Sequence, residues 1–167
     1  MKTITFLLTF FIGLNGLFAQ NDKKPASPKD SSEMVMGDLN IKVNYSSPSV
    51  KGRKIFGELV PYDKVWRTGA NNATVFEINN PLMVEGKELP AGKYGLFTIP
   101  GENKWVIIFN SAWKQWGAYK YSEKKDVLRV EVPSMMIPEH FERFTIKLEN
   151  GFMLIMWDHT SVQVALN

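Results

Sequence analysis

The sequence predicts an all-β protein, an antiparallel β-sandwich or a jelly-roll-like barrel of about eight or nine short strands. Apolar and polar residues alternate along the chain from Met34 onward, as they do in Leu39–Tyr45. This period of two is typical of a strand that buries one face. Glycine and proline interrupt the alternating runs at short intervals, and no run keeps a helical period. Together these observations favour a fold of short strands joined by turns.

Each predicted strand is one alternating run between two turn signals. Two hairpin turns are expected, one at Glu85–Lys87 and one at Glu149–Gly151, because both carry residues that favour tight turns. The run Phe152–Trp157 is apolar on both faces, so we expect it in the middle of the fold. The other strands are expected at 39–45, 74–78, 93–99, 105–109, 127–132, 141–148 and 160–166.

Length and composition bound the class of protein. A chain of 167 residues suggests one folded domain. The absence of cysteine excludes disulfides, iron–sulfur clusters, cysteine-ligated zinc and a thiol nucleophile. With two histidines and a net charge of +3, the sequence predicts no metal site, no cofactor and no nucleic-acid partner.

The first residues have the order of a secretory signal peptide. Lys2 precedes an apolar stretch, and Ala19 ends it with a small residue, so cleavage is expected after residue 19. The following segment, 20–33, has no large apolar side chain and is expected to be a flexible leader. We therefore expect an exported protein, periplasmic or extracellular, with a single β domain over 34–167. No later segment approaches the length that a membrane-spanning helix needs.

The first long segment without clear alternation is 46–72, and it carries candidate binding groups. Trp66 offers a flat wall, Arg67 a clamp for an anion or carboxylate, and Asn71 an amide that donates and accepts hydrogen bonds. The alternative is structural: Arg67 would pair with one internal carboxylate, and Asn71 would satisfy backbone groups of the loop.

The second such segment, 110–126, is rich in aromatic residues. It holds two tryptophans and two tyrosines within nine residues, and Gln115 lies among them. Aromatic surfaces beside amides are the groups that sugar or peptide ligands use. Alternatively, these rings pack in the core or cover an open end of the barrel.

No catalytic constellation is recognisable. His159 is followed by Ser161, but no strained nucleophile turn accompanies them. The sequence therefore assigns no catalytic residue.

Longer motifs carry a resemblance to a known family. The runs SSPSVKGRKIFGELVPYDKVWRTGANNAT, LPAGKYGLFTIPG, WVIIFN and QWGAYKY closely resemble the bacterial secreted family called domain of unknown function 2911, found mainly in Bacteroidetes-type genomes. The resemblance covers residues 25–166 and implies an exported single domain. It supplies no established catalytic residues.

The leading hypothesis is a binding module whose site is formed by the loops 46–72 and 110–126, for a small polar or carbohydrate-like ligand. One alternative is a metal-independent hydrolase or lyase that uses His159 or a carboxylate together with Arg67. Another is a structural protein of the bacterial envelope. The ligand-binding residues expected under the leading hypothesis are Trp66, Arg67, Asn71, Gln115, Trp116 and Tyr119.

Overall fold

The computed structural model describes residues 25–167 of the chain. The predicted signal peptide, its cleavage point and residues 20–24 of the predicted leader lie outside the described residues. Within the described part, no helix has the length and apolar character needed to cross a membrane.

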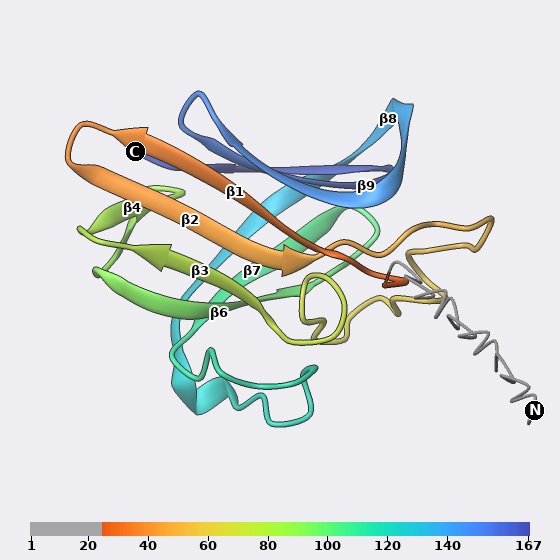
Figure 1. The fold of residues 1–167 in the computed structure, drawn as a ribbon, viewed down its shortest axis with the longest axis horizontal. Helices are drawn as coiled ribbons and strands as arrows, with labels where there is room; N and C mark the ends of the chain where they lie inside the picture. Colours follow the sequence, from red (N-terminus) through yellow and green to blue (C-terminus); the bar gives the residue numbers. More distant parts are fainter. Residues whose placement is uncertain (1–24) are drawn as a thin grey trace, which may run out of the picture.

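Strands make up almost all the regular structure of residues 25–167, which confirms the all-β class (Figure 1). A short 3₁₀ helix, η1, covers Glu123–Lys125. The strands are β1 (Lys29–Met36), β2 (Leu39–Ser46), β3 (Thr74–Ile78), β4 (Leu82–Val84), β5 (Lys87–Leu89), β6 (Gly92–Ile99), β7 (Lys104–Asn110), β8 (Asp126–Glu149) and β9 (Phe152–Ala165).

Seven strands form one curled antiparallel sheet in the order β1-β2-β3-β6-β7-β8-β9, while β4 and β5 form a separate hairpin. Alternation explains which face is inside: Ile41 and Val43 of β2 are buried, whereas Lys42 between them is exposed. The predicted hairpin turns are present. Glu85 and Gly86 both have positive φ, as the tight turns that connect paired strands require.

A bend in β8 turns the sheet into two layers. Its first part pairs with β7 and its last part with β9. Within the part paired with β9 the register shifts twice, first between Met136 and Phe141 and then between Phe141 and Thr145. Bulges of this kind bend a strand and increase its twist. The β8–β9 hairpin consequently folds back over β1 and β2 (Figure 1).

Hydrogen bonds join the layers, among them one from the end of β2 and one between β1 and β8. Ser47 Oγ donates to the carbonyl of Phe144 at 2.7 Å, and the backbone N–H of Leu148 donates to Ser32 Oγ at 2.9 Å. The space between the layers holds a cluster of edge-to-face and stacked rings. Its members are Phe56, Trp66, Trp105, Phe144 and Trp157.

The prediction of a flexible leader over 20–33 is wrong for residues 29–33. They form the first part of β1, which pairs with β2 in continuous antiparallel register from Lys29 to Met36. The side chains of this part are mostly exposed, so hydrophobic burial does not mark it as a strand. This part is a strand because its backbone pairs with β2. In addition, the Tyr45 hydroxyl donates a hydrogen bond to the Asp30 carboxylate at 3.1 Å.

Candidate functional site

The loop between β2 and β3, residues 47–73, turns back on itself repeatedly before it reaches β3. Seven of its residues have left-handed backbone, a conformation that non-glycine residues adopt at a cost. Thr68 is the most unusual case, because it is β-branched, fully buried and has φ of 53°. Backbone held in such conformations is often found at functional sites. The positions with positive φ are Lys51, Gly52, Gly57, Asp63, Thr68, Gly69 and Asn71.

Strand β6 holds the part of this loop that contains Arg67. The backbones of Trp66 and Thr98 exchange two hydrogen bonds, of 2.7 and 2.9 Å, and the hydroxyls of Thr68 and Thr98 lie 3.1 Å apart. The indole N–H of Trp66 donates to the carbonyl of Gly69 at 3.1 Å. Arg67 therefore projects from a segment that is fixed on both sides.

Trp66, Arg67 and Asn71 line one cavity of ≈ 350 Å³. This volume lies in the range of about 300–1,000 Å³ that is typical of small-molecule sites. Lys51 and Trp157 also line the cavity. Trp66 serves mainly as part of the ring cluster between the layers, with its indole stacked on that of Trp157 at 5.9 Å and 14°.

Arg67 is half-buried and has no partner for its charge among the described residues. Its Nε atom is inaccessible to solvent and makes no hydrogen bond. Burial lowers the pKa of Arg67 below its ordinary value, and the neighbouring Tyr119 acts in the opposite direction. The structural alternative, in which Arg67 pairs with an internal carboxylate, is not found among residues 25–167.

Asn71 supports part of the structural interpretation. Its side-chain amide donates a long hydrogen bond of 3.4 Å to the carbonyl of Ser27. Its own carbonyl accepts from the backbone N–H of Gly117 at 2.9 Å. Asn71 thus connects the residues before β1, its own loop and the second loop at the edge of the cavity.

Trp157 is a residue of the cavity that the sequence analysis missed. It lies in β9, only 2% exposed, and its indole Nε1 is buried with no hydrogen-bond partner. Buried tryptophans usually find an acceptor for this N–H group. The run Phe152–Trp157 was expected in the middle of the fold, and nothing in its apolar pattern distinguishes a ring that also reaches a cavity.

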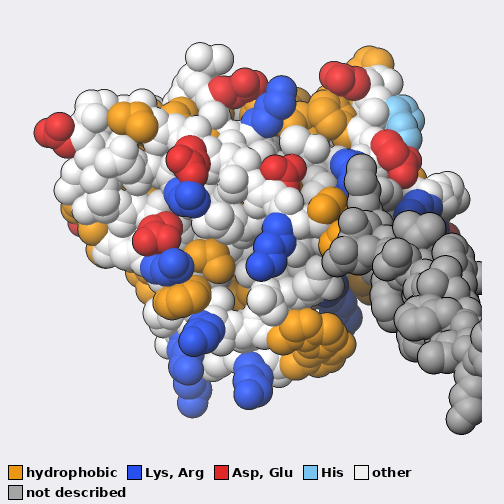
Figure 2. Space-filling view, viewed as in Figure 1, with side chains coloured by type: hydrophobic (Ala, Val, Ile, Leu, Met, Phe, Trp, Pro, Cys, Tyr) orange, Lys and Arg blue, Asp and Glu red, His pale blue; other side chains and the backbone are white. Residues whose placement is uncertain are grey.

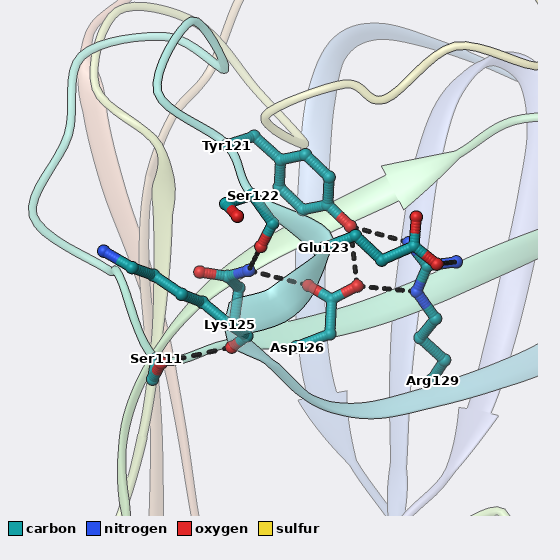
Figure 3. Close-up of polar contacts among 8 residues, drawn as sticks. Ser111, Tyr121, Ser122, Glu123, Lys125, Asp126 and Arg129 are labelled. Carbon is teal, nitrogen blue, oxygen red and sulfur yellow. Dashed lines mark hydrogen bonds and ion pairs between the residues drawn. The ribbon is translucent and has the colours of Figure 1, made fainter.

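A polar network fixes the base of the second loop, residues 111–125 (Figure 3). Asp126 accepts hydrogen bonds from the hydroxyl of Tyr121, from Arg129 Nε and from Asn110 Nδ2, each at 2.6 Å. Arg129 also donates to the Tyr121 oxygen at 2.7 Å. Burial and the hydrogen bond to Asp126 raise the pKa of Tyr121 to about 12. Asp126 is therefore fully partnered, in contrast to Arg67.

The two loops meet through their backbones. The N–H of Ala73 donates to the carbonyl of Gln115 at 3.0 Å, and Asn72 and Trp116 form an isolated antiparallel bridge. Asn72, Gln115 and Trp116 line a second cavity, of ≈ 310 Å³. The side-chain amide of Gln115 donates to the carbonyl of Ala112 at 2.7 Å, which leaves its buried Oε1 without a partner.

The tip of the second loop carries an exposed aromatic pair. Trp116 and Tyr119 stack at 5.6 Å with 7° between their rings, and they are 63% and 83% exposed. Figure 2 shows hydrophobic side chains gathered on this lower part of the face, where Figure 1 places the loop. The other two aromatic residues, Trp113 and Tyr121, are partly buried, and Lys93 Nζ lies 4.6 Å from the centroid of the Trp113 ring.

The predicted site residues therefore fall into two neighbouring groups. Trp66, Arg67 and Asn71 line the first cavity, whereas Gln115 and Trp116 line the second. Tyr119 lines neither cavity and is exposed on the second loop, near enough to Arg67 to influence the pKa of its guanidinium.

The histidines lie outside both cavities. His140 Nε2 is 3.4 Å from Asp158 Oδ1, the two imidazole rings are 5.2 Å apart, and His159 Nδ1 lies 3.2 Å from the carbonyl of Ile137. Neither histidine lines the cavity that holds Arg67. No group of three or more metal-ligating side chains is found within residues 25–167.

Comparison with the curated proteins and with the solved structures gives no match. Comparison with protein families gives one described as "Protein of unknown function (DUF2911)", which covers residues 27–166. The match extends over most of the chain and includes both loops of the candidate site, so the protein belongs to the DUF2911 family.

Proposed function

We propose that this protein is an exported binding module that takes a small polar, carbohydrate-like ligand where the loops 46–72 and 110–126 meet. The observation that carries the proposal is the state of Arg67. A buried guanidinium nitrogen without a partner, on a side chain that lines a cavity of ligand size, is costly to the folded protein. A ligand that accepts a hydrogen bond there would remove that cost.

The exposed aromatic pair supports a ligand with a flat apolar face. Trp116 and Tyr119 leave large ring surfaces in water, although a soluble domain normally buries such area. Sugar rings offer an apolar face together with hydroxyl groups at the edge. Gln115 lines the second cavity together with Trp116 of this pair, and its Oε1 is an acceptor that has no partner among the described residues.

A thermal-shift screen tests this proposal. The purified protein is melted against glycans, short peptides and organic acids. A ligand at about 100 times its Kd stabilises a protein by about 2.7 kcal/mol, which raises Tm by roughly 5–10 °C for a chain of this size. A well-folded sample whose Tm does not change with any member of the panel contradicts the binding function.

Two variants connect a positive result to the site. We expect Tyr119→Ala to lose most of the ligand-induced shift without a large change in the Tm of the free protein, because its ring is 83% exposed. Met136→Ala is the matched control, since Met136 is also 83% exposed but lies in β8, outside both cavities. Equal shifts in the two variants would place the ligand elsewhere.

Export to the periplasm or beyond is part of the proposal and rests on the signal-peptide pattern of residues 1–19. N-terminal sequencing of the protein recovered from a bacterial periplasm or medium tests it. A chain that begins at Gln20 agrees with export and cleavage. A chain that stays in the cytoplasm and still begins at Met1 contradicts it.

A further inference from the structure

The cavity around Arg67 has an unusual balance of charge and hydrogen-bond donors. Three of its lining residues are cationic, namely Lys51, Arg53 and Arg67, while none of the described lining residues is Asp or Glu. Glu142 accepts the backbone N–H of Lys51 at 3.1 Å, but its carboxylate does not line the cavity. The cavity therefore favours negative charge.

The three cationic side chains differ in whether they already have hydrogen-bond partners in the protein. Arg53 is committed to the loop, because its Nε donates to the carbonyl of Val50 at 3.0 Å and its Nη2 to that of Ser49 at 2.5 Å. Lys51 and Arg67 make no side-chain ion pair among the described residues. Arg67 is the more buried of the two, so a ligand would gain most from it.

A second unpartnered donor belongs to another residue that lines the same cavity. The indole Nε1 of Trp157 is buried and makes no hydrogen bond, and Trp157 also lines the cavity. Both orphaned groups, Arg67 Nε and Trp157 Nε1, are N–H donors that cannot accept. Water could serve as an acceptor for either, but a lining with three cationic residues, and with two residues that carry unpartnered donors, suits an anionic oxygen better.

We infer that the ligand of the proposed site is acidic, and that its carboxylate, sulfate or phosphate group is held in this cavity by Arg67 and Trp157. This inference rests on the proposed function and narrows it to an acidic sugar or a similar small acid. Gly117, which lies between the stacked Trp116 and Tyr119 in the sequence, donates its backbone N–H to the carbonyl of Asn71 in the cavity lining at 2.9 Å. The ring of such a ligand would therefore reach the exposed aromatic pair while its acidic group enters the cavity.

Calorimetric titration with matched pairs of sugars tests the inference. Each pair differs in one acidic group: glucose with glucuronate, galactose with galacturonate, and N-acetylglucosamine with its 6-sulfate and its 6-phosphate. We expect the acidic member of at least one pair to bind tenfold or more tightly, roughly the effect of one charge-assisted hydrogen bond. The member that binds best distinguishes carboxylate, sulfate and phosphate.

Three variants assign the effect to the cavity. Arg67→Gln should bring the affinities for the two members of a pair to within about threefold of each other. Lys54→Gln is the control: it removes one charge from the same loop, but Lys54 is exposed and pairs with Glu58 at 3.3 Å, outside the cavity. Trp157→Phe keeps an aromatic ring and removes only the N–H donor, and it should weaken acidic ligands more than neutral ones.

The outcomes separate this inference from the proposed function. If neutral and acidic members bind equally, or if the thermal screen finds only neutral ligands, the binding function stands and the acidic ligand is refuted. If neither the pairs nor the screen gives any binding, the proposed binding function and the acidic ligand are both refuted. An acidic preference that Lys54→Gln reduces as much as Arg67→Gln would show general attraction by positive charge, and it would also refute the assignment to this cavity.

Discussion

Replacing Arg67 by methionine is expected to raise the stability of the free protein. Methionine keeps an unbranched apolar side chain of similar length and removes the guanidinium. The charge that is lost has no ion-pair partner among the described residues, and its Nε is buried without a hydrogen bond. The substitution therefore removes an unfavourable desolvation and breaks no side-chain hydrogen bond or ion pair among residues 25–167.

The size of the effect follows from the state of that group. A buried polar group left without a partner costs about 1–3 kcal/mol. Arg67 is only half-buried, so the lower end of this range applies. We expect Arg67→Met to add about 1 kcal/mol to the free energy of unfolding, which is roughly 2–4 °C in Tm for a chain of this length.

Arg129→Met is the matched control, because the same change removes an arginine with partners. Arg129 donates to Asp126 at 2.6 Å and to the Tyr121 oxygen at 2.7 Å (Figure 3). Its loss leaves the carboxylate of Asp126, which is 7% exposed, without its ion pair. We expect the free energy of unfolding to fall by about 2–3 kcal/mol.

Chemical denaturation at pH 7, monitored by tryptophan fluorescence, measures both variants against the unchanged protein. The account requires shifts of opposite sign for the two arginines. If Arg67→Met lowers the denaturation midpoint as far as Arg129→Met does, Arg67 holds the fold together, and its role as a ligand-binding group is refuted.

The remaining predictions concern the backbone of the first loop and one buried tyrosine. Gly69 has φ of 149°, and an added Cβ would lie 3.0 Å from the carbonyl oxygen of Ser46. Gly69→Ala should therefore lower the free energy of unfolding, measured by chemical denaturation, by about 2 kcal/mol and weaken ligand binding. An unchanged denaturation midpoint would contradict this close contact between Gly69 and Ser46. Asn71 has φ of 59°, a left-handed conformation that glycine adopts more easily than alanine. Asn71→Gly should therefore change the free energy of unfolding by a few tenths of a kcal/mol, whereas Asn71→Ala should lower it by about 1 kcal/mol. Equal denaturation midpoints for the two variants would show that the backbone carries no strain at this position. Burial raises the pKa of Tyr45 from 10.0 to about 12, so its contribution to stability is complete below pH 10 and is lost as pH rises to 12. Unfolding of Tyr45→Phe should therefore depend less on pH between 9 and 12 than that of the unchanged protein, by about 2 kcal/mol across the range, and parallel pH profiles would contradict this.

Alternation in the sequence predicts the strands that bury one face. β2, β3, β6 and β7 lie where the period of two places them. In β2 the inward side chains are apolar and the outward ones are polar, whereas β6 and β7 also bury Phe97 and Ile108 in a second, smaller core cluster. Alternation does not predict the first residues of β1, because backbone pairing with β2 holds them there and their side chains are mostly exposed.

The long strand β8 shows another limit of prediction from alternation. β8 was expected as two strands, 127–132 and 141–148, with an interruption between them. The structure continues the strand through this interruption and bends it there by bulges. Bulges change which residues face inward without ending the strand's hydrogen bonding. Alternation alone therefore predicts an end of the strand where a bulge lies.

The candidate site was predictable as two loops but not as a set of contacts. The residue types of Arg67, Asn71 and Trp116 are typical of binding groups. The structure places Asn71 and Trp116 where the loops meet and Arg67 in the cavity that Asn71 also lines. The identity of the unpartnered donors is a property of the packed molecule. Trp157 has the same apolar context in the sequence as its neighbours, and its orphaned N–H is visible only when its surroundings are known.

The central claim is that an anionic group accepts hydrogen bonds from Arg67 and Trp157 in one cavity. Proton–nitrogen correlation spectra test it most directly, because each of the five tryptophans gives one indole N–H signal, and Trp157→Phe identifies the signal of Trp157. Sulfate, phosphate and glucuronate are titrated in turn. The account predicts that at least one of them moves the Trp157 signal to saturation in the unchanged protein and not in Arg67→Gln. A Trp157 signal that stays in place in all three titrations would contradict it, whatever the signal of Trp116 does.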